Sequence, residues 1–139
     1  MSERNFNMRL KCRYEGTDNN IAGLEVEHKV DDEWVPLDLG LNSPGFDVFV
    51  YAIFACQHRF FRVVCAERQL VLDSAEGNIT IGAGEDWHME SMRVHFSGKL
   101  EAGNSSPEDI DAVVSRMKQC PVSRNIASIP HSESTVTLV

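Results

Sequence analysis

The chain has 139 residues, of which 42% are hydrophobic and 24% charged. This composition is typical of a folded globular protein and excludes an intrinsically disordered chain, and the length predicts a single domain over residues 1–139. The 13 lysines and arginines against 21 aspartates and glutamates give a net charge of −8. That charge has the wrong sign for binding nucleic acid or an anionic membrane surface, so neither is expected as a partner.

Membrane insertion and export are not indicated either. The longest apolar run, 48–56, is far shorter than the roughly 20 residues that cross a bilayer as a helix. The N-terminus lacks the basic and then apolar stretch of a secretory signal, so we expect a cytoplasmic protein. Four cysteines are too few and too dispersed for a disulfide scaffold, and they are expected to rest as thiols: Cys12, Cys56, Cys65 and Cys120.

The first third of the chain alternates apolar and polar residues, with the period of two that is typical of a strand with one wet face. This pattern predicts strands over 6–13 and 24–30, which turn-forming residues at 16–20 join into a hairpin. A third strand over 33–37 is short and lies at an edge, because Pro36 cannot donate a ladder hydrogen bond.

A long helix is predicted over 44–68. Ser43 is its expected N-cap, Pro44 is its first residue, and Asp47 lies in the first turn, where the helix dipole favours negative charge. From 46 to 56 the helix is apolar on almost every side, which requires burial on every side. One chain of this size has little material to wrap it, so we expect the second subunit of a homodimer to cover part of it.

The remaining chain is predicted to contain two strands, two helices and a last strand. A polar turn at 73–77 precedes strands that begin at 79–81 and cover 92–100, a helix from 107 to 119 or 120 that Ser106 caps, a short helix over 121–128, and a strand over 135–139. Because the strands come in hairpins rather than alternating singly with helices, the predicted fold class is α+β.

Two cysteines occupy notable positions, one inside the predicted central helix and one at a helix junction. Local sequence leaves open which thiol is more acidic, since Cys120 would lie beside the free amides of the next helix. The segment 43–47 (Ser-Pro-Gly-Phe-Asp), Cys56 nine residues after its aspartate, and the later segment 120–124 (Cys-Pro-Val-Ser-Arg) together resemble the OsmC/Ohr family of hydroperoxide reductases. The match extends over about residues 42–125.

The resemblance implies an OsmC-like fold of antiparallel sheets with a long central helix, assembled as an intertwined homodimer. It also implies a thiol peroxidase. The Cys56 thiolate would attack a small organic hydroperoxide and become a sulfenic acid, Cys120 would condense with it to a disulfide, and a dithiol reductant would restore both thiols. No metal or organic cofactor is required, and the five histidines show no metal-ligand spacing.

In the family, an acidic residue of the central helix holds an arginine that is aimed at the reactive cysteine. The resemblance assigns the acidic role to Asp47, which is one methylene shorter than the usual glutamate. No arginine lies between positions 14 and 58, so Arg13 is the nearest candidate for the arginine, although its alternation places it opposite the buried face. Arg59 shares the helix face of Cys56 at i+3, and the choice of arginine therefore stays open.

Alternatives to an enzyme also stay open. A cysteine in an apolar helix is usually an inert small hydrophobe, and Cys12 and Cys65 are interpreted in this way. Without a clear arginine, the same dimeric scaffold could instead bind a small apolar ligand, or its Cys56–Cys120 disulfide could sense the redox state.

Overall fold

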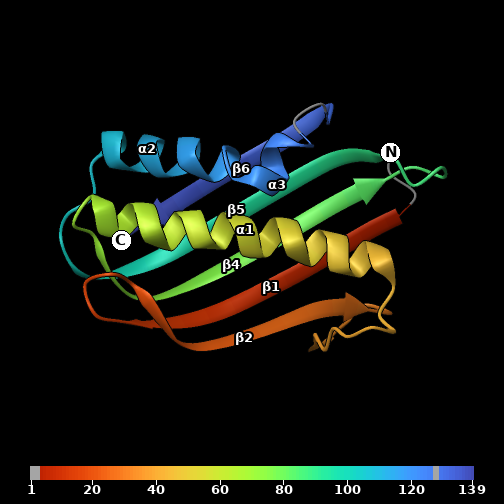
Figure 1. The fold of residues 1–139 in the computed structure, drawn as a ribbon, viewed down its shortest axis with the longest axis horizontal. Helices are drawn as coiled ribbons and strands as arrows, with labels where there is room; N and C mark the ends of the chain where they lie inside the picture. The colour runs from red at the N-terminus through yellow and green to blue at the C-terminus, as the bar shows by residue number, and fades with distance from the viewer. Residues whose placement is uncertain (1–3, 127–128) are drawn as a thin grey trace.

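A six-stranded sheet organises the chain. In the computed structural model, which describes residues 4–126 and 129–139, the strand order is β3-β2-β1-β4-β5-β6 (Figure 1). All neighbouring strands are antiparallel except β5 and β6, which the intervening helices make parallel. The predicted α+β class is confirmed, whereas the strand patterns did not reveal the parallel pair. The strands are β1 (Arg4–Glu15), β2 (Asn20–Val30), β3 (Glu33–Pro36), β4 (Val71–Ala83), β5 (Met89–Ala102) and β6 (His131–Leu138).

The predicted hairpin and the short edge strand are both present. Alternate residues of β1, including Met8, Leu10 and Cys12, are buried, and the residues between them face away from the core. The turn after β1 ends at Asn19, which is fully buried and has a positive φ of 53°. Its side-chain amide donates a hydrogen bond of 3.0 Å to the Leu70 carbonyl, which ties the hairpin to the start of β4.

The polar segment 73–77, predicted as a turn, lies inside β4. This prediction is wrong because the segment runs between β1 and β5, which supply ladder partners on both sides. Within this segment, the pairing of β4 with β5 is irregular only near the start, where the register shifts between Leu72 and Ser74. A Cβ at Gly77 would lie 2.5 Å from the ring of Phe96 on β5. The glycine therefore allows an aromatic ring to lie directly on the strand.

Helix α1 (Gly45–Glu67) is the predicted central helix and lies lengthwise across the sheet (Figure 1). Ser43 does not cap it as predicted, because Ser43 Oγ accepts a hydrogen bond from the Gly40 amide, and Pro44 is the cap residue. Asp47 does lie in the first turn. By length and composition, α1 is the one helix of the described residues that could span a membrane. Eight of its residues are nevertheless buried, as expected of a core helix packed against the sheet.

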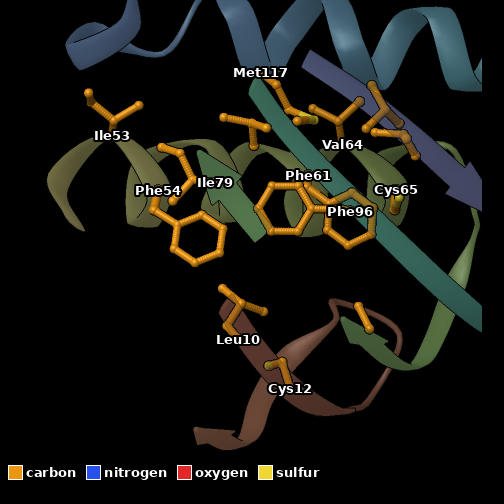
Figure 2. Packing of buried hydrophobic residues seen from close by; sticks show 14 of the residues in the cluster. Leu10, Cys12, Ile53, Phe54, Phe61, Val64, Cys65, Ile79, Phe96 and Met117 are labelled. Carbon is orange, nitrogen blue, oxygen red and sulfur yellow. The ribbon is translucent and has the colours of Figure 1, made fainter. Parts of the chain in front are cut away.

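The hydrophobic core lies between α1 and the sheet (Figure 2). Phe54 and Phe61 of α1 stack on Phe96 of β5, with ring centroids 5.7 and 5.0 Å apart, and all three are fully buried. Burying an aromatic side chain stabilises the fold by roughly 1.5–3 kcal/mol. The stack therefore fixes the rotation of α1 about its axis and turns Cys56 away from the sheet.

Two further helices lie beside α1 on the same side of the sheet (Figure 1). Helix α2 (Pro107–Lys118) begins as predicted, since Ser106 Oγ accepts from the Asp109 amide and the Asp109 carboxylate accepts from the Ser106 amide. Helix α3 (Pro121–Arg124) follows at once and ends earlier than the predicted 121–128, of which 127–128 lie outside the described residues. Strand β6 then begins before the predicted position 135.

Candidate active site

Cys56 and Cys120 lie where α1 passes α3. Cys56 lies at the middle of α1 and is partly exposed, while Cys120 directly precedes α3 and is fully buried. Both residues are free thiols, and Cys120 is near enough to raise the pKa of Cys56. The structure therefore places the two cysteines of the predicted redox pair near each other.

The surroundings of Cys56 hold its proton firmly. Burial, the largest cause, raises the pKa of Cys56 to about 11. The interaction with the neighbouring Cys120 thiol adds to this effect. Two groups lower this pKa, namely the backbone amide of Val122, which donates to the sulfur, and the positive charge of Arg59. Cys56 is therefore mainly a neutral thiol near pH 7, and these two groups stabilise its thiolate once the proton has left.

A buried chain of hydrogen bonds surrounds the Cys120 sulfur. The Ser123 amide donates to this sulfur at 3.3 Å, and the Cys120 thiol donates to Ser123 Oγ at 3.0 Å. Ser123 Oγ also accepts from Gln57 Nε2 at 3.0 Å, and Ser134 Oγ donates to Gln57 Oε1 at 3.0 Å. Every member of the chain is buried, and together they link α3, α1 and β6.

The other two predicted site residues lie away from the thiols. Asp47 is nine residues before Cys56 on α1, which is ~13 Å along a helix axis, and it forms no ion pair with any residue that the structure describes. Arg13 is exposed on the face of β1 opposite the core and lies over Gly23 of β2. The role of Arg13 therefore stays a prediction, and within one chain the cation that lowers the pKa of Cys56 is Arg59.

Sequence reasoning did not find the groups that hold Cys120. Ser123 was part of the recognised motif, but its bonds to the sulfur were not foreseen. Gln57 gave a weak signal as the first polar residue after the apolar run 48–56, and Ser134 gave none, because a serine in a strand is ordinary. Val122 acts through its backbone amide, which no side-chain pattern reveals.

A second buried polar pair lies on the other side of α1. His58 Nε2 and the Tyr14 hydroxyl share a hydrogen bond of 2.7 Å, and the imidazole ring stacks against Phe61 and Phe96. Burial and, to a smaller extent, the charge of Arg62 lower the pKa of His58 to about 4. Among residues 4–126 and 129–139, no group of three or more His, Cys, Asp or Glu could hold a metal ion.

Several solved structures share this arrangement of sheet and helices. An OsmC-like protein from Mycoplasma pneumoniae has a TM-score of 0.56 and 14% identity, covering 83% of this chain and 89% of its own. An OsmC-like hydroperoxide resistance protein from Jannaschia sp. CCS1 has a TM-score of 0.56 and 14% identity over 89% and 87%. A hypothetical protein from Aquifex aeolicus VF5 has a TM-score of 0.57 and 10% identity over 94% and 96%.

Sequence comparison adds no further relative, since neither a protein-family model nor a curated protein matches the chain. The structural likeness at these identities is a likeness of fold. The chain has the fold of OsmC-like proteins, as the two motifs of its sequence predict.

Proposed function

We propose that this protein is a thiol-dependent peroxidase that reduces organic hydroperoxides through Cys56 and Cys120. The observation that carries the proposal is the proximity of two free thiols from separate elements, one partly exposed and one buried, close enough for Cys120 to raise the pKa of Cys56. A partly exposed thiol can meet a substrate, and a thiol near it can close a disulfide without a large movement. The similar Jannaschia structure is that of a hydroperoxide resistance protein, and the proposal extends such chemistry to this chain.

The two thiols act in turn. Cys56 loses its proton and its sulfur attacks the distal oxygen of ROOH, so that the O–O bond breaks, ROH leaves with a proton, and Cys56 becomes a sulfenic acid. The Cys120 sulfur then attacks the Cys56 sulfur, which expels water and forms a disulfide. A dithiol reductant restores both thiols by exchange, donating two electrons and two protons. None of these steps uses a metal or an organic cofactor.

Two groups of this chain favour the first step. The Val122 amide and the Arg59 guanidinium both stabilise negative charge on the Cys56 sulfur. We assign Arg59 the role of the activating cation. Asp47 is kept in the proposal as an acid that orients a cation, on the strength of the sequence resemblance alone.

The helix surface before Cys56 suits an apolar substrate. Val48 and Phe49 are 43% and 37% exposed, and Phe49 and Ala52 lie on the same side of α1 as Cys56, two turns and one turn before it. An alkyl or aryl hydroperoxide would bury this surface as its peroxide group reaches the sulfur. The proposal also includes a homodimer, which would cover the rest of this helix side, and a reducing cytoplasm that supplies the dithiol.

The test is stopped-flow oxidation of the reduced protein by cumene hydroperoxide and by hydrogen peroxide, followed by loss of free thiol. Wild type should react at least about a hundredfold faster than free cysteine and prefer the organic peroxide, Cys56→Ser should not react in this way, and Cys120→Ser should stop at the sulfenic acid. Because Cys56 has a pKa of about 11, its rate should rise by about tenfold per unit from pH 6 to 9. Oxidation as slow as that of free cysteine would refute the proposal.

A second candidate function is a non-enzymatic one, and the raised pKa of Cys56 favours it. A weakly ionised thiol oxidises slowly, which suits a redox sensor or a protein that binds a small apolar ligand on the same scaffold. A ligand binder would show a higher Tm with an apolar ligand in both wild type and Cys56→Ser. A sensor would form the Cys56–Cys120 disulfide but be reduced again too slowly for turnover.

A further inference from the structure

The chain of hydrogen bonds around Cys120 has a direction. Ser134 is a hydroxyl donor to Gln57 Oε1, which leaves the Gln57 amide hydrogens facing the other way, toward Ser123 Oγ. Ser123 Oγ accepts from Gln57 and, while Cys120 is a thiol, also from Cys120. Once Cys120 has lost its proton, the hydroxyl hydrogen of Ser123 can turn toward the sulfur. The sulfur already accepts the Ser123 amide at 3.3 Å.

This chain of hydrogen bonds reaches only one thiol of the pair, Cys120. Cys120 bonds to both the amide and the hydroxyl of Ser123, whereas Cys56 forms no hydrogen bond to any of these side chains. Gln57 and Ser134 form no hydrogen bond to either sulfur, yet both are buried; Ser134 bonds to Gln57, and Gln57 bonds to Ser123. A buried glutamine with both ends satisfied holds its neighbours in one arrangement.

We propose that Ser134 and Gln57 are positioning residues that act through Ser123 to stabilise the reduced form of Cys120, which makes Cys120 the leaving group when the Cys56–Cys120 disulfide is reduced. In the disulfide, Cys120 has no proton to donate and no negative charge to attract donors, so the chain stabilises the reduced state more than the oxidised one. The inference deepens the proposed function and rests on the pairing of these two cysteines.

The exchange step then has a defined course. A dithiol thiolate attacks the sulfur of Cys56, because Cys56 is partly exposed and Cys120 is fully buried. The Cys56–Cys120 bond breaks, its electron pair goes to the Cys120 sulfur, and Ser123 donates its amide and hydroxyl hydrogens to that thiolate. The second thiol of the reductant attacks the mixed disulfide, which releases Cys56 and leaves the reductant as a disulfide.

The experiment starts from protein oxidised with diamide, so it does not require peroxidase activity. The oxidised protein is equilibrated with dithiothreitol buffers of graded ratio, alkylated and weighed, and the rate of its reduction is followed in parallel. Ser134→Ala and Gln57→Met should each shift the equilibrium about three- to tenfold toward the disulfide and slow reduction by a similar factor. Ser134→Thr, which keeps the hydroxyl, should restore most of both values.

Ser132→Ala is the matched control. Ser132 is exposed two residues before Ser134 on β6 and lines the same cavity, of about 240 Å³, as Ser134 and Gln57, but it has no part in the chain of hydrogen bonds. If Ser134→Ala and Gln57→Met, with Tm showing them folded, behave as Ser132→Ala does, the inference is wrong. A monothiol added to the oxidised protein should be found on Cys56 by peptide mass mapping. Finding it on Cys120 would overturn the assignment of the leaving group, whether or not the protein reduces peroxides.

Discussion

At the scale of single residues, the buried imidazole of His58 couples the stability of the fold to pH. The Tyr14 hydroxyl and the rings of Phe61 and Phe96 surround it. Burial and the nearby positive charge of Arg62 both disfavour the protonated ring. The pKa of His58 is lowered to about 4 from its ordinary 6.5, chiefly by burial. The unfolded chain therefore takes up a proton at a pH where the folded chain does not.

The free energy of unfolding should fall as the pH drops from 6.5 to 4. The stability that neutral His58 contributes is fully present above pH 6.5 and is lost toward the folded pKa, by up to about 3 kcal/mol. Urea titrations at pH 7.0, 5.5 and 4.5 measure this loss. His58→Gln should lower the free energy of unfolding at pH 7 and make it depend less on pH across this range, whereas His131→Gln, at an exposed position, should keep the wild-type pH dependence. An unchanged slope in His58→Gln would exclude His58 as its source.

The same scale shows what sequence could and could not predict about the site. The motifs singled out Cys56 and Cys120, which the structure places near each other, because a helix position and a residue before proline are local properties. The role of Arg13 stays a prediction, because nothing in one sequence shows which cation a folded sheet brings near a thiol. The bonds of Gln57 to Ser123 and Ser134 join three distant segments, and no spacing rule connects them.

At the scale of elements, β4 depends on a glycine for its fit against β5. Phe96 lies over Gly77 and also stacks on Phe54 and Phe61 of α1, so the ring occupies the space between the sheet and the helix. A methyl group at position 77 would meet ring atoms at 2.5 Å, and the ring has little room to move because it is fully buried. The position therefore controls how closely α1 approaches the sheet.

Gly77→Ala should destabilise the protein by about 1–3 kcal/mol, which is the usual cost of overpacking a core. Gly45→Ala is the matched control, because a Cβ there meets nothing within 4 Å and alanine favours a helix by up to about 1 kcal/mol over glycine. Chemical denaturation of both variants at pH 7 compares the two effects. A Gly77→Ala variant as stable as Gly45→Ala would show that Phe96 does not limit this position.

Element predictions succeeded where local pattern and tertiary setting agree. The 6–13 alternation, the apolar helix and the Ser106 cap all appeared near their expected positions, because each has a local physical cause. The 73–77 turn failed because a central strand can accept polar and small residues when both neighbours bond to its backbone. The parallel pairing of β5 and β6 depends on how α2 and α3 cross the sheet, which hydrophobic periodicity does not encode.

At the scale of the whole molecule, one chain leaves a broad apolar surface uncovered. α1 and its neighbouring helices cover the middle and the β6 side of the sheet, while β2 lies at the opposite side, beyond α1 (Figure 1). Large hydrophobic side chains of β2 and of the first turns of α1 are exposed by 37–43%: Ile21, Leu24, Val30, Val48 and Phe49. Exposed apolar surface that extends over two adjacent elements is typical of a subunit interface.

The proposed homodimer would cover this surface, and Ala52 on the outer side of α1 is a sensitive place to test it. Ala52→Arg would bury an unpaired charge in the interface, which costs several kcal/mol and should weaken dimerisation at least about a hundredfold. Light scattering after size-exclusion chromatography should give twice 15.6 kDa for wild type and close to 15.6 kDa for Ala52→Arg. Ala102→Arg, at an exposed position at the end of β5, should remain dimeric. A wild-type mass of 15.6 kDa, or a dimeric Ala52→Arg, would mean that this side of α1 does not join two subunits.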